Sequence, residues 1–207
     1  MAKLERTDKP VSVLLEELEK GELGLPEIQR GYVWNRPQAR DLVDSLYREY
    51  PSGLILLWKP KELPELRQGS LGGSDGKRPD FLVLDGQQRL TSLKRVFAGE
   101  INVYFNVEEE SFQIYSAKLK ADPLWVSVRE VLSRGAVKVW RELRDRLREM
   151  GREVEEEEER LDEYLDSRGT RLREAELAMA QLPDHGYPTS FVYSQIGIQS
   201  EDECHTC

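Results

Sequence analysis

The sequence has few cysteines and few histidines. Its 207 residues include 2 of each, and both cysteines lie at the very end, in Cys204-His205-Thr206-Cys207. A structural zinc site needs about four ligands, and a second ligand pair is missing, because His185 is the only other histidine. We therefore interpret the Cys-x-x-Cys pair as an inert tail rather than as a metal or redox site.

Long apolar segments are also absent. A membrane-spanning helix needs about 20 consecutive apolar residues, whereas the longest apolar run, Leu54 to Trp58, has the length of a strand. The first residues, MAKLERTDKP, lack the hydrophobic region of a signal peptide. The sequence thus predicts a cytoplasmic protein without a membrane partner.

Acidic residues outnumber basic residues by 39 to 30, which gives a net charge of −9. The charge is uneven, since residues 28–100 carry 12 basic and 9 acidic groups and so have a local charge of +3. The overall negative charge argues against nucleic-acid binding over the whole surface. The locally positive segment, in contrast, suits an anionic ligand.

Hydrophobic periodicity predicts an α+β core in the first part of the chain. Apolar runs predict strands at residues 54–58 and 81–84. Alternation on both sides of the glutamates at 108–110 predicts a β-hairpin over residues 102–115. Helices are expected over residues 11–20 with Ser12 as N-cap, from a cap at Asn35 to about Tyr50, and over residues 90–97.

From residue 128 onward the pattern becomes helical. Helices are expected over residues 137–150 and about 153–182, and a tail segment near residues 187–198 is expected to be extended. We therefore expect three parts: a mixed-sheet α+β core over 1–127, a helical subdomain over 128–182, and a short tail over 183–207.

One strand-to-helix connection has an unusual composition. In FLVLDGQQRLTSL, residues 81–93, the sequence Asp-Gly-Gln-Gln-Arg separates a predicted buried strand from a predicted helix. The first N–H groups of a helix have no intrahelical partner, and the helix dipole makes this end partly positive. The turn therefore predicts an anion site, and phosphate is an anion that such turns bind.

Each residue of this turn suits a nucleotide ligand. Gly86 permits close backbone approach, and Arg89 offers planar donors that match phosphate oxygens. Asp85 can hold Mg²⁺ or orient a water, while Gln87 and Gln88 can bond sugar, base or water. The alternative is structural: Asp-Gly is a common turn dipeptide, and the arginine can simply bridge to a neighbouring acid.

A second amide–arginine pair, Gln29-Arg30, precedes a turn earlier in the chain. If the two segments are neighbours, Arg30 and Arg89 converge on one anion, and two arginines around a magnesium-bound triphosphate are chemically reasonable. Alone, Arg30 fits an exposed turn equally well. Tyr32 and Trp34 can stack on a base, although packing in the core is the commoner use of such rings.

Three blocks of sequence resemble a known family. PEIQRGYVW, DLVDSLYREYPSGLILLW and FLVLDGQQRLTSL resemble, in order and spacing, the N-terminal domain of GmrSD-type, modification-dependent (type IV) restriction systems. That domain belongs to the wider ParB/sulfiredoxin-like superfamily, and the resemblance is strongest over residues 11–107. It implies a ParB-like α+β core whose DGQQR motif binds and hydrolyses a nucleoside triphosphate, coupled to recognition of modified DNA.

The resemblance leads to specific expectations for residues and partners. Mg²⁺ is the expected cofactor, held with the nucleotide, and DNA cleavage is expected from a separate HNH-type nuclease domain or subunit, because no histidine-rich nuclease motif occurs here. The expected catalytic residues are Asp85, Gln87 and Gln88, with Asp85 also the metal ligand; the expected nucleotide contacts are Gln29, Arg30, Gly86, Arg89 and Thr91.

Family members continue with a Phe-x-x-x-Asn-type segment, so the family domain is expected to be truncated here, which would leave the pocket incomplete.

Two alternatives to the nucleotide-binding function remain open from the sequence. One alternative is a ParB-like DNA-binding or adaptor module whose motif contacts DNA phosphates without nucleotide turnover. The other is a degenerate protein that only folds.

Overall fold

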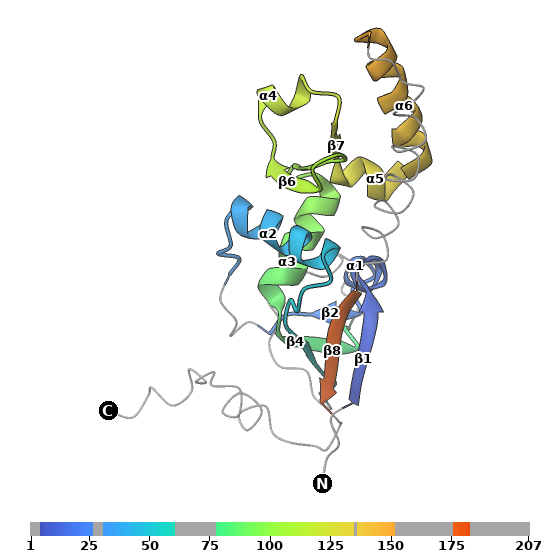
Figure 1. Cartoon of the computed structure of the whole chain (residues 1–207). Helices are drawn as coiled ribbons and strands as arrows, with labels where there is room; N and C mark the ends of the chain where they lie inside the picture. Colours follow the sequence, from blue (N-terminus) through green and yellow to red (C-terminus); the bar gives the residue numbers. More distant parts are fainter. Residues whose placement is uncertain (1–4, 27–30, 61–77, 135, 152–175, 183–207) are drawn as a thin grey trace, which may run out of the picture. The chain divides into compact units, whose positions relative to one another are not determined.

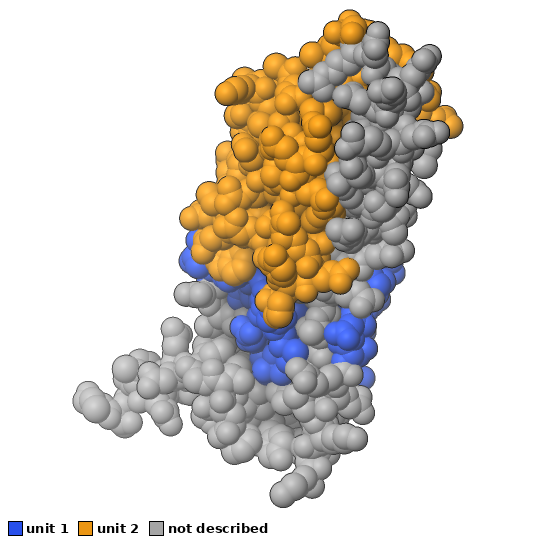
Figure 2. Space-filling model, in the orientation of Figure 1, with its two compact units in different colours: residues 1–33, 53–91, 177–207 blue, residues 34–52, 92–176 orange. Residues whose placement is uncertain are grey.

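The computed structural model describes residues 5–26, 31–60, 78–134, 136–151 and 176–182, and Figure 1 shows its helices and strands, with labels where there is room. The chain divides into two compact units, coloured in Figure 2. Unit 1 comprises Met1–Val33, Gly53–Thr91 and Leu177–Cys207, and unit 2 comprises Trp34–Ser52 and Ser92–Glu176. The predicted mixture of helices and strands is confirmed, whereas the domain boundaries at 127 and 182 stay predictions.

Unit 1 is built on a five-stranded mixed sheet with the order β1-β8-β3-β4-β2. Strand β4 runs parallel to β2 and antiparallel to β3, while β3 runs parallel to β8. The strand bounds are β1 (Glu5–Pro10), β2 (Leu23–Gly24), β3 (Ile55–Trp58), β4 (Phe81–Asp85) and β8 (Glu176–Leu182).

The core of unit 1 follows from its apolar runs. Leu82 and Val83 in β4 have no exposed surface, and because they point to opposite faces, both faces of this strand are covered. Helix α1 (Val11–Glu19) contributes a buried stripe that includes Leu14 and Leu18. It ends where Gly21 takes a positive φ of 71°, as the sequence predicted.

Unit 2 contains a three-stranded sheet with the order β6-β5-β7, in which both pairings are antiparallel. Strands β5 and β6 form the predicted hairpin. The strands of this unit are β5 (Val103–Asn106), β6 (Ser111–Ile114) and β7 (Trp125–Ser127), and its helices include α2 (Arg36–Tyr47), α4 (Ala117–Lys120), α5 (Val128–Arg134) and α6 (Ala136–Glu149). Helix α3 (Gln87–Ala98) begins in unit 1 and ends in unit 2.

A capping box starts helix α2. The side chain of Asn35 accepts from the backbone N–H of Gln38, and the Gln38 side chain accepts from the backbone N–H of Asn35, at 3.0 and 2.9 Å. These two bonds satisfy two N–H groups that a helix start otherwise leaves open. The predicted cap at Asn35 is therefore confirmed.

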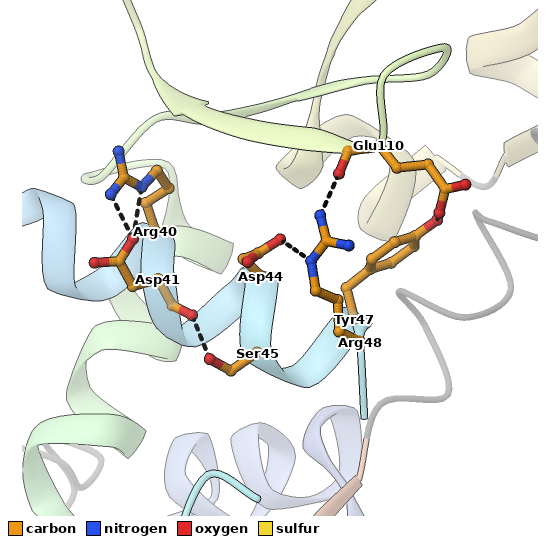
Figure 3. A network of polar contacts seen from close by, with 7 residues as sticks. All are labelled: Arg40, Asp41, Asp44, Ser45, Tyr47, Arg48 and Glu110. Carbon is orange, nitrogen blue, oxygen red and sulfur yellow. Dashed lines mark hydrogen bonds and ion pairs between the residues drawn. The ribbon is translucent and has the colours of Figure 1, made fainter. Parts of the chain in front are cut away.

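The C-terminal end of α2 is joined to the β5–β6 hairpin (Figure 3). The hydroxyl of Tyr47 donates to a carboxylate oxygen of Glu110 at 2.7 Å, and Nη2 of Arg48 donates to the Glu110 carbonyl at 2.7 Å. The hydrogen bond from Arg48 to Asp44 raises the pKa of the arginine. The Tyr47 ring has its centroid 5.2 Å from Phe105, so a polar and an apolar contact fix the same helix end.

Three predictions about secondary structure are wrong. Residues 176–182 form strand β8 rather than the end of a helix, because parallel pairing with β3 overrides the helix preference of the sequence ELAMAQL. Helix α1 begins at Val11 after Pro10, without a side-chain cap, so Ser12 is not its N-cap. Tyr50 lies beyond α2 and is 59% exposed. The rest of the predicted 153–182 helix, and the 187–198 segment, lie outside the described residues.

Candidate functional site

The DGQQR turn joins the end of β4 to the start of α3, as predicted. Asp85, the last residue of β4, pairs with Leu56 of β3 beside a register irregularity. Gly86 follows with a positive φ of 92°, and its carbonyl accepts from the Leu90 N–H at 3.0 Å in the first turn of α3. A Cβ at this glycine would lie 2.3 Å from Cδ1 of the fully buried Ile55. The turn thus requires glycine for both conformation and space.

Asp85 is the most open side chain of the motif, with 71% of its surface exposed. One of its carboxylate oxygens accepts from Nη2 of Arg89 at 3.1 Å. A carboxylate with this exposure can reach a ligand or a metal ion in solvent. Its ion pair with the arginine is of the surface type, which contributes about 0–1 kcal/mol to stability.

Arg89 connects the first turn of α3 to the start of β3. Its Nη2 donates to the Leu54 carbonyl at 2.7 Å as well as to Asp85, and its side chain is only 12% exposed. The guanidinium lies against Gly53, where an added Cβ would come within 2.4 Å of Nη1. The sequence also allowed a structural role, in which the arginine bridges to a neighbouring acid. Arg89 does make such a bridge, but its acid, Asp85, is exposed to solvent.

Gln88 connects the same turn to a different segment. Its side-chain oxygen accepts from the backbone N–H of Val33 at 2.9 Å, and its side-chain nitrogen donates to the Gly31 carbonyl at 3.0 Å. Gln88 is half-buried, and Gln87 is 7% exposed. The side chain of Gln88 thus contacts backbone at both of its polar atoms.

The other predicted site residues divide into two groups. Thr91 is half-buried in α3, two residues after the motif. Gln29 and Arg30 lie outside the described residues, but Gly31, which follows them directly in the sequence, is bonded to Gln88. The structure therefore brings together the DGQQR motif and the backbone that follows the Gln-Arg pair.

Sequence reasoning missed two partners of the motif, Gly53 and Leu54. Both act through their backbones, Gly53 by leaving room for the guanidinium and Leu54 by accepting from it. The signal in the sequence is Pro-Ser-Gly at 51–53, which also follows the end of helix α2. A positive φ of 86° at Gly53 shows its second use.

The turn offers one exposed carboxylate, that of Asp85, as a ligand for Mg²⁺. Among the described residues there is no group of three or more histidine, cysteine, aspartate or glutamate side chains that could hold a metal ion. Mg²⁺ commonly binds one or two carboxylates and completes its shell with phosphate oxygens and water. One exposed carboxylate, that of Asp85, therefore fits an ion that arrives with phosphates.

Among the residues that the structure describes, no helix is long and apolar enough to cross a membrane.

Comparisons with known proteins give a family and a relative for this chain. Residues 11–183 match the family described as the GmrSD restriction endonuclease N-terminal domain. A curated relative, the uncharacterized protein MJ0686 of Methanocaldococcus jannaschii, is 35% identical over 88 residues, which cover 39% of this chain and 15% of the relative. The chain thus corresponds to a small part of that longer relative.

Proposed function

This chain belongs to the family of GmrSD restriction endonuclease N-terminal domains, and we propose that it binds and hydrolyses a nucleoside triphosphate at the β4–α3 turn. In this proposal it is the regulatory domain of a modification-dependent antiphage restriction system and has no nuclease site of its own. We also propose that its α+β core is of the ParB/sulfiredoxin-like type. The mixed sheet that leads into the Gly86 turn supports the proposed nucleotide site, because a helix start after a strand is a frequent phosphate site.

The observation that carries the proposal is the double hydrogen bond of Gln88. Through Gly31 and Val33 it holds, at the first turn of α3, the backbone that directly follows Gln29-Arg30. The backbone that follows one amide–arginine pair is therefore bonded to a glutamine of the other, within unit 1. An arginine in the first turn of a helix is a combination that suits a polyphosphate.

The proposed role of Asp85 follows from its position. Asp85, being exposed at the end of β4, is placed to orient the attacking water and to hold a Mg²⁺ ion bound to the phosphates. When bound, that ion neutralises charge on the phosphate oxygens. Gln87 is proposed to assist the reaction, while the contacts to the nucleotide come from Gln29, Arg30, Gly86, Arg89 and Thr91.

Contact between Nη2 of Arg89 and phosphate requires a change of partner, because both N–H groups of this nitrogen are already bonded. Its bond to Asp85 belongs to an exposed ion pair of about 0–1 kcal/mol, so a phosphate with more than one charge can replace the carboxylate at little cost. Its bond to the Leu54 carbonyl is part-buried and can persist. The arginine can thus turn part of its guanidinium to a ligand while it still holds β3.

The activity of the whole system involves partners outside this chain. We propose that modified DNA is recognised through the full system and that an HNH-type nuclease domain or subunit cuts it. Nucleotide turnover here would then regulate that cleavage.

A thermal-shift experiment tests nucleotide binding. ATP, GTP, CTP and UTP are added separately with MgCl2 to the full chain, to the Arg89→Ala variant and to a control, Arg141→Ala, which removes an exposed arginine of α6. A ligand at 100 times its Kd stabilises the folded protein by about 2.7 kcal/mol. We expect one or more nucleotides to raise the Tm of the wild type and of Arg141→Ala, but not of Arg89→Ala.

The same preparations test the alternative. Binding of duplex DNA is measured between 50 and 200 mM salt. Over this range, a protein that makes about 6–10 phosphate contacts loses about 10³-fold or more of its affinity. If no nucleotide shifts the Tm and DNA binds with this salt dependence, the domain is a DNA-binding module. If neither ligand binds, the nucleotide proposal fails as well.

A further inference from the structure

The side chain of Gln88 makes an unusual pair of contacts for a reacting group. Its oxygen accepts from the N–H of Val33 and its nitrogen donates to the carbonyl of Gly31. In an extended segment, the carbonyl of one residue and the N–H of the second residue after it point to the same side. The primary amide of Gln88 therefore bonds Gly31 and Val33 in the way that the N–H and the C=O of one residue in a neighbouring strand would.

We propose that Gln88 is a positioning residue, instead of the reacting group expected from the sequence. Its amide clamps the Gly31–Val33 backbone to the first turn of α3 and so fixes that backbone beside the turn at which the nucleotide is proposed to bind. The role in nucleotide binding rests on the proposed function, but the clamp itself is defined by two bonds of 2.9 and 3.0 Å. Both polar atoms of the amide are used in this clamp.

The chemistry of the clamp requires an amide. Glutamate retains an acceptor for Val33 but has no N–H for Gly31, and its second carboxylate oxygen would face the Gly31 carbonyl oxygen. Methionine has nearly the same length and neither bond. Both polar atoms of the Gln88 side chain are bonded to the backbone of a distant segment.

The test compares Gln88→Met and Gln88→Glu with the wild-type chain. The matched control is Gln113→Met, because Gln113 is an exposed glutamine on β6. The first readout is hydrogen exchange of the Val33 backbone amide, followed by NMR. Loss of one hydrogen bond of ordinary strength is expected to speed exchange at Val33 about fivefold in Gln88→Met, with no change in Gln113→Met.

The second readout separates positioning from chemistry. With Mg-ATP, Mg-GTP, Mg-CTP and Mg-UTP assayed separately, we expect Gln88→Met and Gln88→Glu to raise KM about tenfold or more and to leave kcat within about twofold. A fall in kcat with KM unchanged would mean that Gln88 acts on the reacting atoms, and the positioning role would be wrong. Unchanged KM and kcat would also overturn it.

The two readouts keep the two proposals distinct. If the wild type neither binds nor turns over any nucleotide, the proposed function fails. The clamp is then still judged by hydrogen exchange at the Val33 amide. Faster exchange in Gln88→Met would then support the clamp, and unchanged exchange would refute it. If the wild type binds without turnover, Kd takes the place of KM.

Discussion

The guanidinium of Arg89 lies against the backbone of Gly53, so closely that a Cβ on the glycine would come within 2.4 Å of Nη1. Gly53 also has a positive φ of 86°. The arginine of the motif and a glycine before β3 therefore depend on each other, and this relationship leads to the first prediction.

Gly53→Ala is expected to destabilise unit 1 by about 2–3 kcal/mol, because the left-handed conformation of an alanine costs about 1–2 kcal/mol and the clash adds to it. The control is Gly151→Ala, since Gly151 has a φ of 71° with nothing within 4 Å of an added Cβ. Urea unfolding should show a smaller loss, about 1 kcal/mol, for the control. In Gly53→Ala/Arg89→Ala the two effects should not add; additive losses would show that no contact joins them.

Gly86→Ala is expected to be more damaging than Gly53→Ala. The new Cβ would lie 2.3 Å from Cδ1 of Ile55, which is fully buried and cannot move aside. Ile55→Val removes that methyl group and alone costs about 0.5–1.5 kcal/mol. In the Gly86→Ala background it should instead recover part of the stability measured by urea unfolding, and only part, because the Ile55 Cα lies 3.4 Å away. A further loss in the double variant would contradict the contact.

Asp85 and Arg89 should differ sharply in what their substitution costs. Asp85→Asn is expected to change stability by less than about 0.5 kcal/mol, because the side chain is 71% exposed. Nucleotide hydrolysis by this variant should fall about 10²-fold or more if Asp85 orients the water. The measurement is phosphate release at saturating Mg-nucleotide, beside a urea unfolding curve.

Arg89→Lys is expected to lose stability, by about 1–3 kcal/mol. Lysine keeps the charge but cannot reach the Leu54 carbonyl and the Asp85 carboxylate with one planar group. Thermal and urea unfolding should both show the loss. If Arg89→Lys unfolds like the wild type, the bond to Leu54 contributes nothing and the description of Arg89 as a link to β3 is wrong.

Tyr47→Phe tests the contact between α2 and the β5–β6 hairpin. The variant keeps the buried ring and removes the hydroxyl that donates to Glu110 at 2.7 Å. We expect a loss of about 1 kcal/mol in urea unfolding. Tyr115→Phe is the control, since Tyr115 is 45% exposed, and it should change stability by less than about 0.5 kcal/mol.

The sequence predicted what depends on local pattern. The strand before Asp85, the helix from Gln87 and the cap at Asn35 were all found from apolar runs, a turn glycine and a capping residue. These signals are short-range, because each element is specified by residues within a few positions of it. The strand–turn–helix setting of the DGQQR motif was predictable for the same reason.

What the sequence did not show depends on distant partners. Residues 176–182 are good helix formers, and only pairing with β3 makes them a strand. The contacts of Gln88 with Gly31 and Val33 join residues that are 57 and 55 positions apart, and backbone groups leave no trace in side-chain composition. Their geometry could come only from the folded chain.

The place of β8 in the sheet has a consequence for how the protein is made. β8 lies between β1 and β3, yet its residues are synthesised well after both. On the order of ten seconds of translation separates β3 from β8. During that interval the nascent chain presents two unpaired strand edges that no later segment has yet joined, so this sheet can be completed only after residue 182 has left the ribosome.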